Sequence, residues 1–121
     1  MKQVSIKILH LYIIIQRLAV TDDPREKSRV LRELLIYAYS DGSKVQEKAK
    51  ILSELELKFE SIVSQIYEDR GEVWQGNKYS LDNEYVKIYS ELMARLIRLE
   101  REIIENVSQK FHVPLAIERR V

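Results

Sequence analysis

The hydrophobic positions of the chain fall into four segments in which they recur with the spacing of an α-helix. Recurrence every three or four residues places apolar side chains along one face of a helix. The pattern predicts an all-α fold: a four-helix bundle-like domain in which the last two helices form a long antiparallel hairpin. The predicted helices span about residues 2–20, 24–40, 44–70 and 82–112.

The first segment leaves its secondary structure open. Val4, Ile6 and Ile8 alternate with polar residues, which is typical of a strand. The same segment carries a helical stripe through Val4, Ile8, Leu11, Ile15 and Leu18. Because a lone strand would have no partner, we favour a helix and keep a strand as the alternative. A helix that is apolar on all sides must be covered on most of them, which predicts a central position in the bundle or contact with a second chain.

The second helix has clear boundary signals. Thr21-Asp22-Asp23-Pro24 combines capping side chains with a proline suited to the first helical turn. Asp41-Gly42 is expected to stop the helix, and Ser43 is expected to cap the next one. The residues expected in the core from this helix are Val30, Leu31, Leu34, Leu35 and Ala38.

The third and fourth helices carry heptad-like apolar seams. The seam of the third helix is formed by Val45, Leu52, Leu55, Phe59, Ile62 and Ile66, with Lys48 at its one polar position. The seam of the fourth is formed by Tyr85, Tyr89, Leu92, Leu96, Leu99 and Ile103. Gly71 is expected to end the third helix and open a loop over 71–81, and Pro114 closes the fourth and leaves a short tail at 113–121.

The lengths of these helices suggest a way for the protein to act. At 1.5 Å per residue each long helix would reach about 40 Å, roughly twice the length of the first two. Two short helices cannot cover both long ones completely, so apolar surface remains for a partner. Self-association, most simply as a dimer, would cover it, whereas a monomeric bundle with frayed ends is the alternative.

Composition excludes most enzyme chemistry. The length of 121 residues suits a single domain, 1–121, and the absence of cysteine rules out disulfides, thiolate metal sites and cysteine nucleophiles. Two histidines, His10 and His112, cannot form a multi-histidine metal site, and three scattered glycines make no phosphate-binding loop. We therefore predict no cofactor, no metal, no catalytic residues and a protein that is not an enzyme.

Charge is unevenly distributed along the chain. Residues 1–50 hold ten basic and six acidic side chains, whereas residues 51–105 hold seven basic and twelve acidic ones. This asymmetry indicates an electrostatic partner, or mixed faces once the helices lie side by side. The most concentrated basic group is the basic row, formed by Arg17, Arg25, Lys27, Arg29 and Arg32. Such a row can neutralise successive phosphates, which makes it the candidate nucleic-acid contact.

Two further sets of residues are candidate sites. The loop at 71–81 contains the only tryptophan, and its candidate partner contacts are Val73, Trp74, Lys78 and Tyr79. Arg95, Arg98 and Arg101 on the fourth helix define a third hypothesis, an enzyme that acts by electrostatic stabilisation. The sequence argues against it, because these arginines are expected to form i,i+4 pairs in Glu91–Arg95, Arg98–Glu102 and Arg101–Glu105.

The leading hypothesis is a non-enzymatic helical interaction or scaffold protein that self-associates and binds another macromolecule. The alternative is a small nucleic-acid-associated accessory protein that uses the basic row. The apolar run near the N-terminus is too short to span a bilayer and carries no cleavage pattern, so we expect no membrane partner and a cytoplasmic location. Abundant Ile, Glu, Lys and Arg with few asparagines lean toward a thermophilic source.

Overall fold

In the computed structural model, the described part of the chain forms four α-helices and no strand. Residues 6–73 and 83–111 are described, and of residues 66–73 and Asn83 only the backbone. Helix α1 spans Ile6–Val20, α2 spans Pro24–Ala38, α3 spans Gly42–Val73 and α4 spans Asn83–Phe111. The predicted all-α class is confirmed, and the strand alternative for the first element is wrong.

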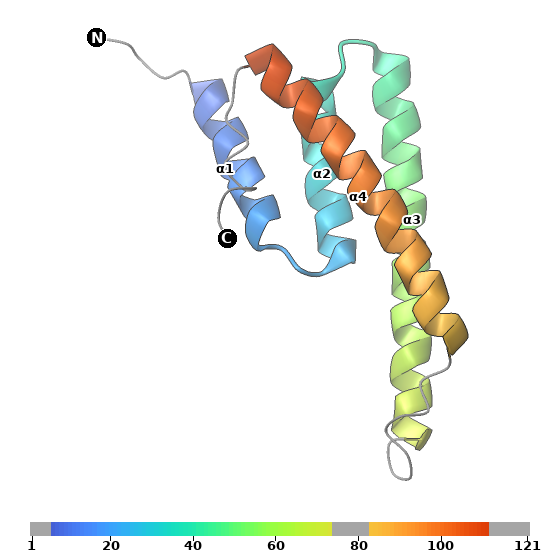
Figure 1. Ribbon diagram of the computed structural model, residues 1–121. Helices are drawn as coiled ribbons and strands as arrows, with labels where there is room; N and C mark the ends of the chain where they lie inside the picture. The colour runs from blue at the N-terminus through green and yellow to red at the C-terminus, as the bar shows by residue number, and fades with distance from the viewer. Residues whose placement is uncertain (1–5, 74–82, 112–121) are drawn as a thin grey trace.

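Helix α2 is the element around which the others pack. It contacts α1, α3 and α4, and its contact with α3 is the most extensive in the molecule. Helices α1, α2 and α3 lie side by side, and α4 runs diagonally across α2 and α3 (Figure 1). The predicted central position of the first helix is therefore wrong. Helix α1 lies at the edge of this layer because the short turn at 21–23 folds α2 back along one side of it, and α2 takes the central place.

Capping fixes where the second and third helices begin. The side chain of Asp23 accepts a hydrogen bond from the backbone N–H of Arg25 at 2.9 Å, and Pro24 is the first helical residue, as predicted. Helix α3 begins at Gly42, and Asp41 accepts a hydrogen bond from the Ser43 N–H at 2.9 Å. The expectation that Ser43 caps this helix is corrected, because the carboxylate of Asp41 already serves the first free N–H groups.

Two predicted helix ends also need correction. Helix α2 ends at Ala38 rather than near residue 40, where the chain turns extended at Tyr39. Helix α3 passes through Gly71 and ends at Val73. A glycine inside a helix costs about 1 kcal/mol relative to alanine, which a helix of this length can accommodate. The predicted loop at 71–81 is therefore helical over its first three residues.

The core confirms the apolar seams for the seam residues whose side chains are described, and the side chain of Ile66 lies outside them. The second-helix residues predicted to be buried are all buried. From the two long helices the fully or almost fully buried seam residues are Leu52, Leu55, Phe59, Ile62, Leu92, Leu96 and Ile103. The ring of Phe59 packs edge-on against Tyr89, with centroids 5.6 Å apart. This contact and the ion pair from Lys48 to Glu102 show that α3 and α4 run antiparallel, as expected for the hairpin.

The long helices extend past the end of α2. Arg25, in the first turn of α2, reaches Glu60 on α3, so α2 begins at about the level of that residue. Helix α3 continues from 61 to 73, which is about 20 Å at 1.5 Å per residue. Figure 1 shows this part of α3 projecting beyond α1 and α2, with the first part of α4 beside it. The two short helices therefore leave one end of the hairpin uncovered, as their lengths predicted.

Replacing Phe59 by alanine tests the core. Phe59 is fully buried, so Phe59→Ala is expected to lower the free energy of unfolding by about 3–5 kcal/mol through lost burial and the cavity left behind. Leu57→Ala is the matched control two residues away, because Leu57 is 69% exposed and should change stability by less than about 0.5 kcal/mol. Urea denaturation measures both, and equal losses would contradict the described packing.

Candidate interaction surfaces

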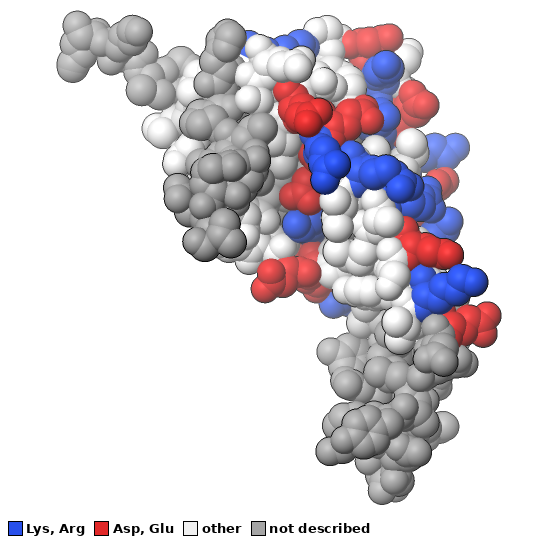
Figure 2. All heavy atoms as spheres, in the orientation of Figure 1, with Lys and Arg blue, Asp and Glu red and all other residues white. Residues whose placement is uncertain are grey.

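Basic and acidic side chains lie intermixed on the face of the molecule shown in Figure 2, despite their segregation along the sequence. Ion pairs join the basic first half of the chain to the acidic middle. They are Arg25–Glu60, Lys27–Glu100, Arg29–Glu56, Arg32–Glu56 and Lys48–Glu102. The charge asymmetry of the sequence is therefore largely satisfied within one molecule, because helices from the two halves pack side by side.

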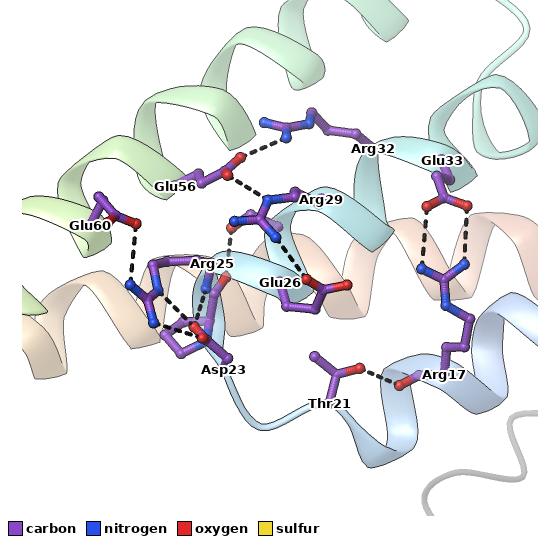
Figure 3. A network of polar contacts seen from close by, with 12 residues as sticks. Arg17, Thr21, Asp23, Arg25, Glu26, Arg29, Arg32, Glu33, Glu56 and Glu60 are labelled. Carbon is purple, nitrogen blue, oxygen red and sulfur yellow. Dashed lines mark hydrogen bonds and ion pairs between the residues drawn. The ribbon is translucent and has the colours of Figure 1, made fainter.

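The centre of this network is Glu56 on α3 (Figure 3). Its two carboxylate oxygens accept hydrogen bonds from Arg29 at 2.7 Å and Arg32 at 2.6 Å. Arg32 also donates to the Ser53 hydroxyl at 2.8 Å, and Arg29 donates to Glu26 one turn earlier at 2.7 Å. Glu56 thus fixes the rotation of α2 against α3 at two successive turns.

The remaining members of the basic row are also paired. Arg25 bonds Asp23 at 2.8 Å and Glu60 at 3.2 Å, and Arg17 pairs with Glu33 of the neighbouring helix at 3.3 Å (Figure 3). Lys27 reaches Glu100 on α4 at 3.3 Å, with both side chains mostly buried. Four members of the row lie on α2 and Arg17 lies on α1, and all five form one side of an ion-pair network. Every cation in it has an intramolecular carboxylate partner.

The protonation of the carboxylates follows from these contacts. Burial raises the pKa of Glu56, but hydrogen bonds from Arg29 and Arg32 outweigh burial, and the net pKa lies below the ordinary value. The pKa of Asp23 is lowered mainly by its hydrogen bond from the Arg25 side chain. Both carboxylates are therefore ionised at neutral pH, and the network holds in its charged form.

A second polar cluster lies where the ends of α2, α3 and α4 meet. The Tyr39 hydroxyl donates to Glu102, which also pairs with Lys48 at 3.1 Å. Burial and the adjacent Glu102 carboxylate raise the pKa of Tyr39, and the hydrogen bond from Tyr39 is the main cause that lowers the pKa of Glu102. The cluster borders a shallow cleft of about 360 Å³ that is lined by charges of both signs. Glu102 therefore serves the packing of α4 rather than the expected pair with Arg98.

The arginines of the third hypothesis have no such partners. Arg98 and Arg101 are exposed and Arg95 is half-buried, and none of the three lies in an ion pair with a described residue. The expected i,i+4 pairs along α4 are not formed in the structure. The sequence predicted that the basic row would be available to a ligand and that the α4 arginines would be paired, and the structure shows the opposite among the described residues. The reason is that the spacing of charges along one helix does not show which carboxylates a neighbouring helix supplies.

The outer face of α1 is the most apolar exposed surface of the described chain. Helix α1 buries Leu11, Ile14, Ile15 and Leu18 against its neighbours. Its opposite side exposes a second stripe, the outer stripe, formed by Ile6, Leu9, Ile13 and Val20. These positions are separated by 3, 4 and 7 residues, so they lie along one line of the helix. The outer stripe was hidden in the sequence because the whole segment is apolar.

Helix α2 adds one more apolar residue on the side of this stripe. Ile13 precedes Arg17 by one turn, and Ile36 follows Glu33 by about one turn. Since α1 and α2 are antiparallel, the Arg17–Glu33 pair places Ile13 and Ile36 at the same level of the helical pair. Ile36 is 66% exposed.

The other residues singled out in the sequence do not form a site in the described part of the chain. The side chain of Val73 and residues Trp74, Lys78, Tyr79 and His112 lie outside the described residues. His10 is exposed and meets the ring of Tyr37 edge-on, with centroids 6.5 Å apart. Among the described residues, no group of acidic and histidine side chains is suited to hold a metal ion, and no helix has the length and apolar character to cross a membrane.

Comparison of the chain with protein-family models, with curated proteins and with solved structures gives no match. Function must therefore be argued from the surfaces themselves. Three surfaces are described: a paired ionic network on α2 and α3, an exposed apolar stripe on α1, and unpaired arginines on α4.

Removing the central carboxylate tests the ionic network. A carboxylate whose pKa is lowered by folding stabilises the protein above its unfolded pKa and loses that contribution as the pH falls through the folded pKa. Wild-type stability is therefore expected to decline as the pH is lowered from about 6 to about 3. Glu56→Gln should lower stability by about 1 kcal/mol at pH 7 and make the acid decline shallower.

The matched control is Glu54→Gln, because Glu54 is exposed and lies in no ion pair with a described residue. Chemical denaturation at several pH values measures both variants. If Glu54→Gln flattened the acid decline as much as Glu56→Gln, the network would have no special role in stability.

Proposed function

We propose that this protein is a non-enzymatic helical interaction protein that self-associates through the outer stripe of α1. The single observation that carries the proposal is a helix with two opposite apolar faces, of which only one is covered by the described chain. A helix that is apolar all round is normally buried on most sides. Because α1 lies at the edge of the layer, no other described helix covers its outer face, and a second chain would cover it.

A second copy is the partner that the outer stripe fits best. One charged residue, Arg17, falls on the line of the stripe between Ile13 and Val20, and its charge is neutralised by Glu33. An interface of this kind supplies no charge pattern to select a different protein, but it matches itself, as a two-fold symmetric interface requires. An isologous dimer is therefore the simplest partner consistent with the surface.

The order of the residues supports an antiparallel pairing of two α1 helices. About Ile13 as the centre, Ile6 and Val20 lie seven residues away on either side. In an antiparallel pair, Ile13 would meet its own copy and Ile6 would meet the partner's Val20. Each end of the stripe would then be covered by an apolar residue, whereas a shifted register would leave one end exposed.

The size of the stripe sets the strength expected. A helix of 15 residues is about 22 Å long and about 10 Å wide, so one face offers on the order of 300 Å². Stable complexes bury about 800 Å² per partner. A dimer held by α1 with help from Ile36 is therefore expected to be reversible and concentration-dependent. The nucleic-acid alternative on the basic row has less support, since each of its cations already has a carboxylate partner.

Introducing a charge at the centre of the stripe tests the proposal. Ile13→Glu would place two carboxylates opposite each other across the two-fold axis and should weaken dimerisation more than tenfold, which corresponds to about 1.4 kcal/mol. The control is Val86→Glu on α4, because Val86 is 51% exposed and Ile13 is 52% exposed. Sedimentation velocity over a range of concentrations measures both. A wild-type protein that stays monomeric throughout would rule out self-association.

Cross-linking tests the orientation. The chain has no cysteine, so single introduced cysteines report on their own positions only. Ile13→Cys should form a disulfide-linked dimer under mild oxidation. A mixture of Ile6→Cys and Val20→Cys should cross-link between the two variants, because antiparallel helices bring these positions together. Preferential linkage of Ile6→Cys to itself would indicate a parallel pair and contradict the proposed arrangement.

A further inference from the structure

We propose that the arginine row on α4 binds the phosphate backbone of a nucleic-acid duplex without sequence preference. The arginine row consists of Arg95, Arg98 and Arg101, extended by Lys58 of α3. The proposal does not depend on self-association, since the row lies on α4 and the outer stripe lies on α1. It also differs from the contact predicted on the basic row, which the ion pairs occupy.

The positive charge of the arginine row is not neutralised by any described carboxylate. None of its four residues lies in an ion pair with a described residue, whereas every member of the basic row does. Glu102, which follows Arg98 by four residues and was expected to pair with it, is held by Tyr39 and Lys48. The packing of α4 therefore withdraws an acidic partner from the row, so a ligand would not have to break intramolecular ion pairs to reach it.

The geometry of the row suits a linear polyanion. The three arginines follow one another at intervals of three residues, so they cover about 9 Å along α4. Arg95 and Lys58 line the same shallow groove of about 420 Å³ between α4 and α3, together with one carboxylate, Glu91, and this carries the row onto a second helix. Figure 2 shows basic side chains in a row across the middle of α4, on the side of the molecule where α4 lies outermost.

The chemistry favours a duplex backbone over other anions. Guanidinium groups form paired hydrogen bonds with phosphate oxygens, and a duplex presents phosphates at regular spacing. The aromatic residues described on α4, Tyr85, Tyr89 and Phe111, pack against the core and offer no platform for unstacked bases. Contacts of this kind position a duplex without reading its sequence.

Salt dependence gives the first measurement. The probe is a short, labelled DNA duplex of mixed sequence, with binding followed by fluorescence anisotropy between about 50 and 200 mM salt. Three to four neutralised phosphates predict a slope of log affinity against log salt of about −3 for each bound chain. A wild-type protein that fails to bind the duplex at the lowest salt would overturn the proposal.

Two variants with the same net charge locate the contact. R98Q/R101Q removes two cations from the row and should reduce affinity more than tenfold at about 50 mM salt, with a slope that is smaller by about 2. K44Q/K50Q removes two exposed lysines from α3 and should stay within about twofold of the wild type. If both variants lost the same amount of duplex affinity, the net charge alone would explain the loss, and the proposed site would be overturned.

The remaining arms separate this inference from its competitors. Both variants should keep the wild-type oligomeric state and melting temperature, because none of the four side chains lies in an ion pair with a described residue. A loss of duplex binding at unchanged oligomeric state therefore reports on the arginine row alone. Poly-glutamate serves as the acidic-protein probe. If the protein bound poly-glutamate more tightly than the duplex, and R98Q/R101Q lost that binding, the surface would be assigned to an acidic protein. The proposal of a duplex ligand would then be overturned.

Discussion

Burial of α2 among the three other helices is the constraint on which the rest of the structure depends. A helix of 15 residues that buries residues such as Val30, Leu31 and Leu34 needs neighbours on several sides, and α1, α3 and α4 supply them. The short length of α2 and its limited number of neighbours have two consequences. Helix α3 runs on past the first turn of α2, and α1, attached by a short turn, can cover only one side of it. The apolar surfaces that stay exposed are therefore those that the packing around α2 does not cover.

The same constraint explains where the charges go. The polar edge of α2 carries Arg25, Arg29 and Arg32, and packing against α3 brings these side chains next to Glu56 and Glu60. Pairing them within the molecule offsets the cost of holding several cations close together at a helix interface. The outer side of α4 faces no other described helix and escapes this pairing. A sequence with almost balanced charge therefore yields one neutralised basic row and one arginine row that has no ion pair with a described residue.

The two proposed surfaces occupy different helices and use different forces. The outer stripe is apolar and not charged, so it favours a matching copy over a charged ligand. The arginine row is charged and lacks exposed aromatic rings, so it favours a repeating anion. A protein with both surfaces could gather on a polyanion as a reversible dimer, in which a weak self-contact and a weak electrostatic contact strengthen each other by raising the effective local concentration.

Much of the fold could be predicted from the sequence, because helical periodicity, the Asp23-Pro24 start and the buried seams are local properties of the chain. The identity of the core residues on α2 and the antiparallel hairpin followed from the same periodicity. Two helix ends were predicted wrongly: Gly71 lies inside α3, and Asp41 caps the start of α3, because length and neighbouring carboxylates override single-residue signals.

The placement of α1 at an edge was not predictable, since its two apolar faces look alike in sequence. The sequence also did not predict which arginines form ion pairs, because the helix packed beside a charged residue supplies its partner. The sequence by itself determined the helices and their buried faces, and only the tertiary structure decided which apolar face and which cations were left free.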